Sequence, residues 1–119
     1  MRIIIDLDGV ICPIKLPNQT YGELKPIYGS IKKIKKLKKE GHHIIINTAR
    51  NMATQKSNIG LVNKNITLIT LKWLEKYKVE FDEIFFGKPN GDVYIDDRAL
   101  KFDGWETITT RNLEKEFKK

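Results

Sequence analysis

Two carboxylates near the start of the chain are spaced so that they can act together in one site. Asp6 and Asp8 follow the apolar run Ile3–Ile5 with one residue between them, so an extended backbone places both on one side. Carboxylates this close repel each other unless they share a proton or bind a hard cation, for which Mg²⁺ is the usual choice. A structural alternative is that Asp6 caps the following turn and Asp8 and Gly9 are only turn residues.

The same arrangement, an apolar run that ends in polar residues, recurs along the chain. A threonine hydroxyl can donate to a phosphate oxygen, a guanidinium can bind phosphate bidentately, and an ammonium can neutralise it. Thr48 has an alternative role as the N-cap of a following helix. The polar residues that follow these later apolar runs are Thr48 and Arg50 after residues 44–46, Lys88 after 84–86, and Asp96 and Asp97 after 93–95.

Strands of a mostly parallel sheet are the elements that would position these side chains. Continuous β-branched runs are typical of buried parallel strands, and ligands of α/β proteins bind at the carboxyl ends of such strands. The sequence therefore predicts an α/β, Rossmann-like three-layer sandwich. Its expected strands cover residues 2–6, 43–48, 81–86, 93–96 and 105–110, and its expected helices cover 27–40, 67–77 and the segment from Arg111.

The formal net charge of +7 comes largely from one lysine-rich segment. Ile31, Ile34 and Leu37 interleave its lysines at helical spacing, which indicates the solvated face of an amphipathic helix rather than a nucleic-acid patch. A positive field still favours an anionic substrate. In the helix expected over 67–77, Trp73 is interpreted as a core residue.

Two polar segments are long enough to reach over the strand ends. Residues 12–22 are rich in turn residues and contain two prolines, so we expect an ordered flap over about residues 11–24. Residues 53–65 show no clear apolar period and are a candidate second substrate loop. We expect both to line the substrate pocket, with Arg50 reaching the substrate and a neighbouring subunit as a further contributor.

Length and composition limit the organisation of the protein. A chain of 119 residues suits one domain, residues 1–119, and leaves no room for a separate cap domain. Cys12 is the single cysteine, which excludes an intrachain disulfide. The apolar runs are too short to span a bilayer and no signal peptide is recognisable, so the expected location is the cytoplasm.

The segments Asp6-Leu7-Asp8-Gly9-Val10 and Gly87-Lys88-Pro89 resemble the first and third motifs of the haloacid dehalogenase superfamily. The resemblance implies that Asp6 is a nucleophile that becomes phosphorylated. It also implies that Asp8 is the general acid and base, with its backbone carbonyl near the metal. Lys88 would neutralise both the nucleophile and the phosphate.

Two further motifs extend the resemblance. Thr48 matches the hydroxyl residue of the second motif, which contacts the phosphate. Asp96 and Asp97 match the fourth motif, which supplies the remaining Mg²⁺ ligands alongside Asp6 and Asp8. Asp97 aligns better with the direct ligand, and Asp96 stays the alternative. Together the four motifs imply Mg²⁺-dependent hydrolysis of phosphomonoesters through an aspartyl-phosphate.

Within the superfamily the sequence looks like the small cap-less phosphatases of capsule and surface-polysaccharide biosynthesis. This implies a sugar phosphate as substrate, with Arg50 and Asn51 as substrate-binding residues. Val10 stands where threonine is commoner, as in some nucleotidases of the superfamily, so a nucleotide stays open as substrate. A nucleic-acid-end phosphatase and a phosphoacceptor signalling module also stay open as functions, although no aromatic-basic pattern favours nucleic acid.

Overall fold

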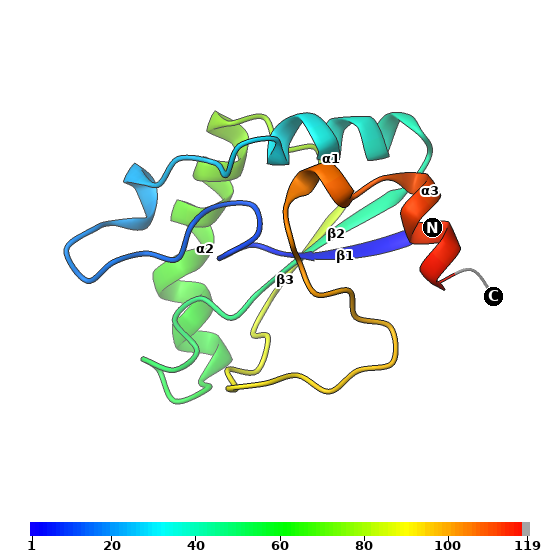
Figure 1. Cartoon of the computed structure of the whole chain (residues 1–119). Coiled ribbons are helices and arrows are strands. Elements are labelled where there is room, and N and C mark those ends of the chain that lie inside the picture. Colours follow the sequence, from blue (N-terminus) through cyan, green and yellow to red (C-terminus); the bar gives the residue numbers. More distant parts are fainter. Residues whose placement is uncertain (118–119) are drawn as a thin grey trace.

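Three parallel strands form the sheet of this protein, whose computed structural model describes residues 1–117 (Figure 1). The strands are β1 (Arg2–Asp6), β2 (His43–Thr48) and β3 (Glu83–Phe86), in the order β1-β2-β3. Asp6 lies opposite Asn47, which in turn lies opposite Phe85. Because the strands are parallel, their carboxyl ends share one edge of the sheet. The predicted α/β class with a parallel sheet is confirmed.

Helices pack against one face of this sheet. Ile5, Ile44 and Ile46 point into a core that they share with residues of all three α-helices. The helices are α1 (Ser30–Lys39), α2 (Ile59–Lys76) and α3 (Thr110–Phe117), and the 3-10 helices are η1 (Tyr21–Glu23) and η2 (Trp105–Thr107). The lysine-rich helix is amphipathic as expected, and Trp73 is a core residue with 2% exposure.

The opposite face of the sheet is open at its two outer strands, β1 and β3, whereas Ile45 on the central strand is 2% exposed. Ile4 is 63% exposed and Phe85 is 53% exposed, and both point away from the helices. The expectation of a fully buried first strand is therefore wrong, because β1 forms one edge of the sheet. A second helical layer is not present among residues 1–117, so the three-layer architecture is not confirmed. No cap domain is inserted in this range either.

Several boundaries differ from the expected ones. Helix α1 starts at Ser30 rather than 27, and β3 starts at Glu83 rather than 81. Helix α2 begins at Ile59, capped by the side chain of Asn58, so much of the unassigned segment 53–65 is helical. The pattern was obscured because only Val62 and Ile66 are buried on its first turns. Residues 118 and 119 of the expected domain lie outside the described residues.

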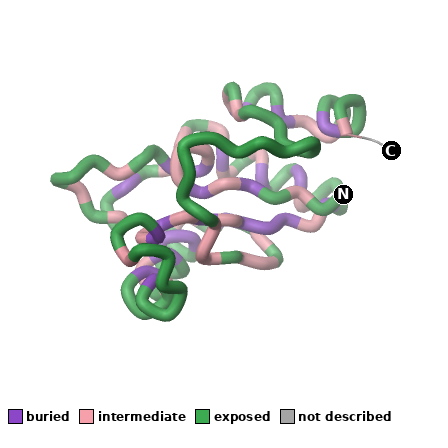
Figure 2. The backbone as a smooth tube through the Cα atoms, turned by 90° about the horizontal axis from the view of Figure 1, so that it is seen from below, coloured by how far each residue is buried: buried purple, intermediate pink, exposed green. Residues whose placement is uncertain are grey.

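Two expected strands do not form. Residues 105–107 are a 3-10 helix after Gly104, whose carbonyl accepts a hydrogen bond from the Thr107 hydroxyl. Val93 and Ile95 are 75% and 97% exposed in a segment without regular structure. We call residues 89–104 the arm. It leaves the sheet after β3 and returns to η2 without joining a strand (Figure 1), and it is exposed over most of its length (Figure 2).

Within residues 1–117, no helix combines the length and the apolar character that crossing a bilayer demands.

Candidate functional site

The carboxyl ends of the strands bring three of the predicted residues together. The Lys88 ammonium lies 3.3 Å from Asp6 Oδ2, and Asp8 lies on the turn that follows β1. All three line a cavity of about 340 Å³, which Asn51 also borders. A lysine and two carboxylates that reach one cavity from two strands can hold an anion and a cation side by side.

A tight turn after β1 fixes the position of Asp8. The Leu7 carbonyl accepts hydrogen bonds from the N–H groups of Ile11 and Cys12, at 2.9 and 3.1 Å. Gly9 adopts a φ of 90°, in the left-handed region that favours glycine. The indole of Trp105 closes the turn by donating to the Val10 carbonyl at 2.7 Å. The backbone at Asp8 is thus fixed by hydrogen bonds to the residue before it, Leu7, and to Val10 after it.

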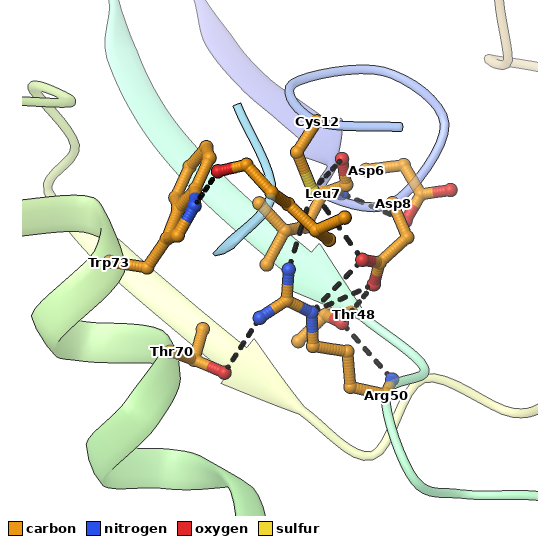
Figure 3. A network of polar contacts seen from close by, with 9 residues as sticks. Asp6, Leu7, Asp8, Cys12, Thr48, Arg50, Thr70 and Trp73 are labelled. Carbon is orange, nitrogen blue, oxygen red and sulfur yellow. Dashed lines mark hydrogen bonds and ion pairs between the residues drawn. The ribbon is translucent and has the colours of Figure 1, made fainter. Parts of the chain in front are cut away.

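Arg50 is turned toward Asp8 (Figure 3). Its Nε lies 3.0 and 3.1 Å from the two Asp8 oxygens, while its other nitrogens donate to Thr70 Oγ1 and Cys12 Sγ. The Tyr21 ring lies 4.2 Å from the guanidinium carbon, and Arg50 is only 3% exposed. Arg50 borders the cavity, and each of its three guanidinium nitrogens donates to a protein atom. Its contact with the substrate stays a prediction.

Thr48 is the second residue that holds Asp8. Its hydroxyl donates to Asp8 Oδ2 at 3.2 Å and accepts from the backbone N–H of Arg50 at 3.1 Å. The residue is fully buried. Its alternative role as a helix N-cap is wrong, because Asn58 caps α2. In this arrangement the hydroxyl orients Asp8, and a phosphate oxygen would compete with that carboxylate for its proton.

Burial and the Asp8 charge also act on two neighbouring side chains. Burial raises the pKa of the Cys12 thiol to about 12, and the negative charge of Asp8 adds to this effect. Burial, followed by the charge of Asp8, raises the pKa of Tyr21 as well. Both groups therefore stay protonated at neutral pH. Cys12 is accordingly not a nucleophile, because only the thiolate reacts.

The two remaining expected metal ligands lie elsewhere. Asp96 and Asp97 are on the exposed arm, where Asp96 Oδ1 accepts a hydrogen bond from the Arg98 backbone at 2.8 Å. Within residues 1–117, no three His, Cys, Asp or Glu side chains gather into a metal-binding group. The expected joining of Asp96 and Asp97 with Asp6 and Asp8 is therefore not found in this structure.

The flap and the second loop line the cavity, as expected of them. Residues missed by the sequence analysis include Tyr94 and Asn90 from the arm; the Lys88 ammonium lies 4.4 Å from the Tyr94 ring centre. Thr70 was also missed, because a threonine on the inner side of a helix carries no sequence signal. The flap contributes Ile14, Lys15 and Tyr21, and the second loop contributes Ala53 and Thr54.

Comparison with known proteins identifies a relative of known structure. No protein-family model matches the chain, and no curated protein does. The chain is similar to an MCSG target from Vibrio cholerae whose crystal structure is known, with 32% sequence identity and a TM-score of 0.85. The match covers 97% of this chain and 95% of that chain. The chain therefore belongs to the same family as this Vibrio cholerae protein.

Proposed function

We propose that the protein is a Mg²⁺-dependent phosphomonoester hydrolase that acts through an aspartyl-phosphate on Asp6. The observation that carries this proposal is the Lys88 ammonium 3.3 Å from Asp6 Oδ2, at a cavity that Asp8 also lines. The obstacle to phosphoryl transfer is that an anion must approach an anion. A cation fixed beside the attacking carboxylate reduces this repulsion. The motif resemblance supports the same assignment.

The chain's own residues can carry out both steps. An Asp6 oxygen attacks phosphorus, the bond to the ester oxygen breaks, and Asp8 donates a proton to the leaving oxygen. Asp8 then accepts a proton from a water molecule that attacks phosphorus, which releases phosphate and restores the Asp6 carboxylate. Lys88 neutralises the phosphoryl oxygens in both steps. Asp8 must give up part of its contact with Arg50 to reach the substrate.

The oxygen donors at the site fit Mg²⁺. This ion is usually held by one or two carboxylates and keeps several waters, and Asp6 and Asp8 both line the cavity. When bound, Mg²⁺ would supply charge stabilisation at the phosphoryl oxygens. The Asp6 side chain and the Asp8 carbonyl would hold it, together with Asp96 or Asp97 if the arm brings one of them close.

The cavity favours a small, anionic and partly flat substrate. Lys15 and Lys88 provide positive charge, and the rings of Tyr21 and Tyr94 provide surfaces on which a sugar can pack. A volume of about 340 Å³ is in the range of small-molecule sites. We therefore favour a sugar phosphate, as in surface-polysaccharide biosynthesis. The same two rings support a nucleotide as the second candidate, because a base also stacks on tyrosine.

We also propose that the complete fold is a Rossmann-like three-layer sandwich. A Rossmann-like three-layer sandwich needs a further layer on the open face of the sheet, where Ile4 and Phe85 are exposed. That layer would have to come from a segment that is unpacked in the single chain or from another copy.

The proposal is tested by phosphate release from a panel of sugar phosphates, nucleotides and an aryl phosphate. We expect release with Mg²⁺, loss of activity with EDTA, and recovery when Mg²⁺ is restored. Asp6→Asn should reduce turnover to background because it removes the nucleophile, while Asp103→Asn, an exposed carboxylate on the arm, serves as the matched control. Circular dichroism should show that both variants remain folded.

The nature of the intermediate gives a second readout. Beryllofluoride should add to Asp6 in the wild type and not in Asp6→Asn. Activity that survives complete metal removal would contradict the Mg²⁺ requirement, and an Asp6→Asn variant with more than a few per cent of wild-type turnover would exclude the covalent route. Stable phosphorylation without turnover would instead indicate a phosphoacceptor module.

A further inference from the structure

Strand β1 has a free edge. It pairs only with β2 within residues 1–117, so the backbone N–H and C=O groups on its outer side have no strand partner. Ile4 on the same strand is 63% exposed. Unprotected edges of this kind readily accept another strand, and proteins normally cover or disrupt them. In β1 the three isoleucines Ile3–Ile5 present no charge or proline that would discourage pairing.

The arm carries a segment that suits this edge. Residues 89–101 are all exposed, and Val93, Tyr94 and Ile95 form an apolar, β-prone run inside them. The run has the same design as β1, an apolar stretch followed by carboxylates. Figure 2 shows most of the arm as exposed chain, although Asn90 and Tyr94 border the cavity. Burying the apolar side chains of this run against a compatible edge lowers the free energy relative to leaving them in water.

We propose that two copies of this chain exchange arms, so that residues 93–96 of each copy add a fourth strand to β1 of the other. Charge favours the exchange. The arm has four carboxylates against two cations, a net charge of −2, which leaves +9 on the rest of a chain whose total is +7. Reciprocal exchange of this kind gives a closed dimer with two-fold symmetry, and it requires few contacts beyond the exchanged strand.

The arm of the same chain cannot easily reach the edge in a parallel orientation. The Lys88 N–H donates to the Thr48 carbonyl at 3.0 Å, so the chain is still tied to the sheet at that point. Residues 89–92 would then cover five Cα steps, at most about 18 Å. The path must pass three strand spacings and the three Cα steps of a four-residue strand, a separation of roughly 17–18 Å, so the linker would have to be fully extended with no clearance for side chains.

The relative from Vibrio cholerae supports a shared arrangement of the arm. The structural match covers 97% of this chain, which leaves out fewer residues than the arm contains. Most of the arm is therefore aligned with the crystal structure of a protein that is 32% identical. A second copy of the chain is a partner that is available to both proteins.

Exchange also has a consequence for the site, which rests on the proposed function. A parallel fourth strand would bring Asp96 and Asp97 of one copy to the carboxyl end of β1, where Asp6 of the other copy lies. The four expected carboxylates would then come from two chains. Neither chain alone would have a complete site.

Molecular mass in solution is the first test. Light scattering after gel filtration should give a dimer for the wild type. Ile95→Lys on the arm and Ile4→Lys on β1 should each shift the protein to monomer, because a charge replaces an apolar contact at the new strand pair. Both side chains are exposed in the single chain, so folding should survive, as circular dichroism can verify. Leu68→Lys, at a residue that is 65% exposed on α2, is the control and should stay dimeric.

Cross-linking shows which chains supply the two partners. A tagged Ile4→Cys chain and an untagged Ile95→Cys chain are mixed, unfolded, refolded together and treated with a short thiol cross-linker. Exchange predicts a product that contains one chain of each kind, whereas Cys12 is buried and should not react. A monomeric wild type, dimers that survive both lysine variants, or a cross-link found only within a chain that carries both cysteines would each overturn the proposal.

Complementation separates this inference from the proposed function. Asp6→Asn and a second variant with both Asp96→Asn and Asp97→Asn should each be inactive, and their co-refolded mixture should regain about one quarter of wild-type activity, because each mixed dimer has one intact site. No recovery despite an active wild type would exclude a shared site. An inactive wild type would contradict the proposed function, and the mass and cross-linking results would still decide on the exchange.

Discussion

The guanidinium of Arg50 donates to Asp8, Thr70 and Cys12 in the structure. Because it follows a strand end, this guanidinium was expected to bind the substrate. The Tyr21 ring covers it on the flap side. The sequence places Arg50 near the site but does not reveal its partners, because Thr70 and Tyr21 come from distant segments. Its contacts make it a residue that positions Asp8.

Replacing Arg50 should affect Asp8 more than substrate binding. Arg50→Met leaves the partly buried Asp8 carboxylate without its cation, and breaking such a pair costs about 3 kcal/mol of unfolding free energy. Turnover of an alkyl phosphate, whose leaving oxygen needs a proton, should fall more than turnover of an aryl phosphate, with little change in KM. Urea unfolding and steady-state kinetics measure the two effects.

The matched control for Arg50 is Thr70→Val, which removes only one hydrogen bond to the guanidinium and should keep the leaving-group preference of the wild type. Arg50→Lys keeps a positive charge and should recover part of the turnover. A large rise in KM for both substrates with unchanged kcat would instead show that Arg50 binds the substrate directly.

At the scale of elements, the junction after β3 determines where Lys88 lies. Gly87 has a φ of 91°, and a Cβ at this position would lie 2.5 Å from Ile59 Cδ1 at the start of α2. The next residue, Lys88, is tied to the carboxyl end of β2 by its N–H. The strand end, the glycine and the first turn of α2 thus position the ammonium beside Asp6.

Gly87→Ala should weaken both the fold and the site. A left-handed conformation costs a non-glycine residue about 1–2 kcal/mol, and the contact with Ile59 adds to this cost. Because Lys88 follows directly, we also expect a lower kcat. Gly22→Ala is the control, because nothing lies within 4 Å of its Cβ position. Thermal unfolding and kinetics of both variants give the comparison, and equal behaviour would show that the junction tolerates a side chain.

The elements that could be predicted from the sequence are those with strong local patterns. Strands β1 and β2 were recognised because three consecutive isoleucines mark each of them, and α1 was recognised because its apolar residues recur every three residues among lysines. The run at 93–95 was expected to be a strand on the same grounds, but it has no strand partner within residues 1–117. A pattern shows which segment can pair, whereas the available edge and the reach of the linker decide whether it does.

At the scale of the whole molecule, His42 joins the two ends of the described chain. Its Nδ1 lies 2.9 Å from the Met1 ammonium and its Nε2 lies 2.8 Å from Thr110 Oγ1, at the start of α3. Burial, followed by the positive charge of the N-terminus, lowers the pKa of His42, although Glu40 and Glu114 oppose this. The neutral ring is therefore the form that the folded protein favours.

Stability should fall as the pH drops below the unfolded-state pKa of His42, about 6.5. In that range the unfolded chain binds a proton that the folded protein resists, so the free energy of unfolding decreases until the lower folded-state pKa is reached. His42→Gln, which can still contact Thr110, should lack this part of the decrease. Urea unfolding at a series of pH values from about 7.5 to about 5 tests this. Parallel curves for the two proteins would contradict it.

The hydrogen bond from the Trp105 indole to the Val10 carbonyl has a consequence for synthesis of the chain. Trp105, which closes the turn that holds Asp8, is translated 95 positions after Val10. At about 5–20 residues per second, several seconds separate the two events. Until then the turn lacks the hydrogen bond that closes it, although β2 and Thr48 have already been translated. The turn that holds Asp8 can therefore be completed only after Trp105 has been translated.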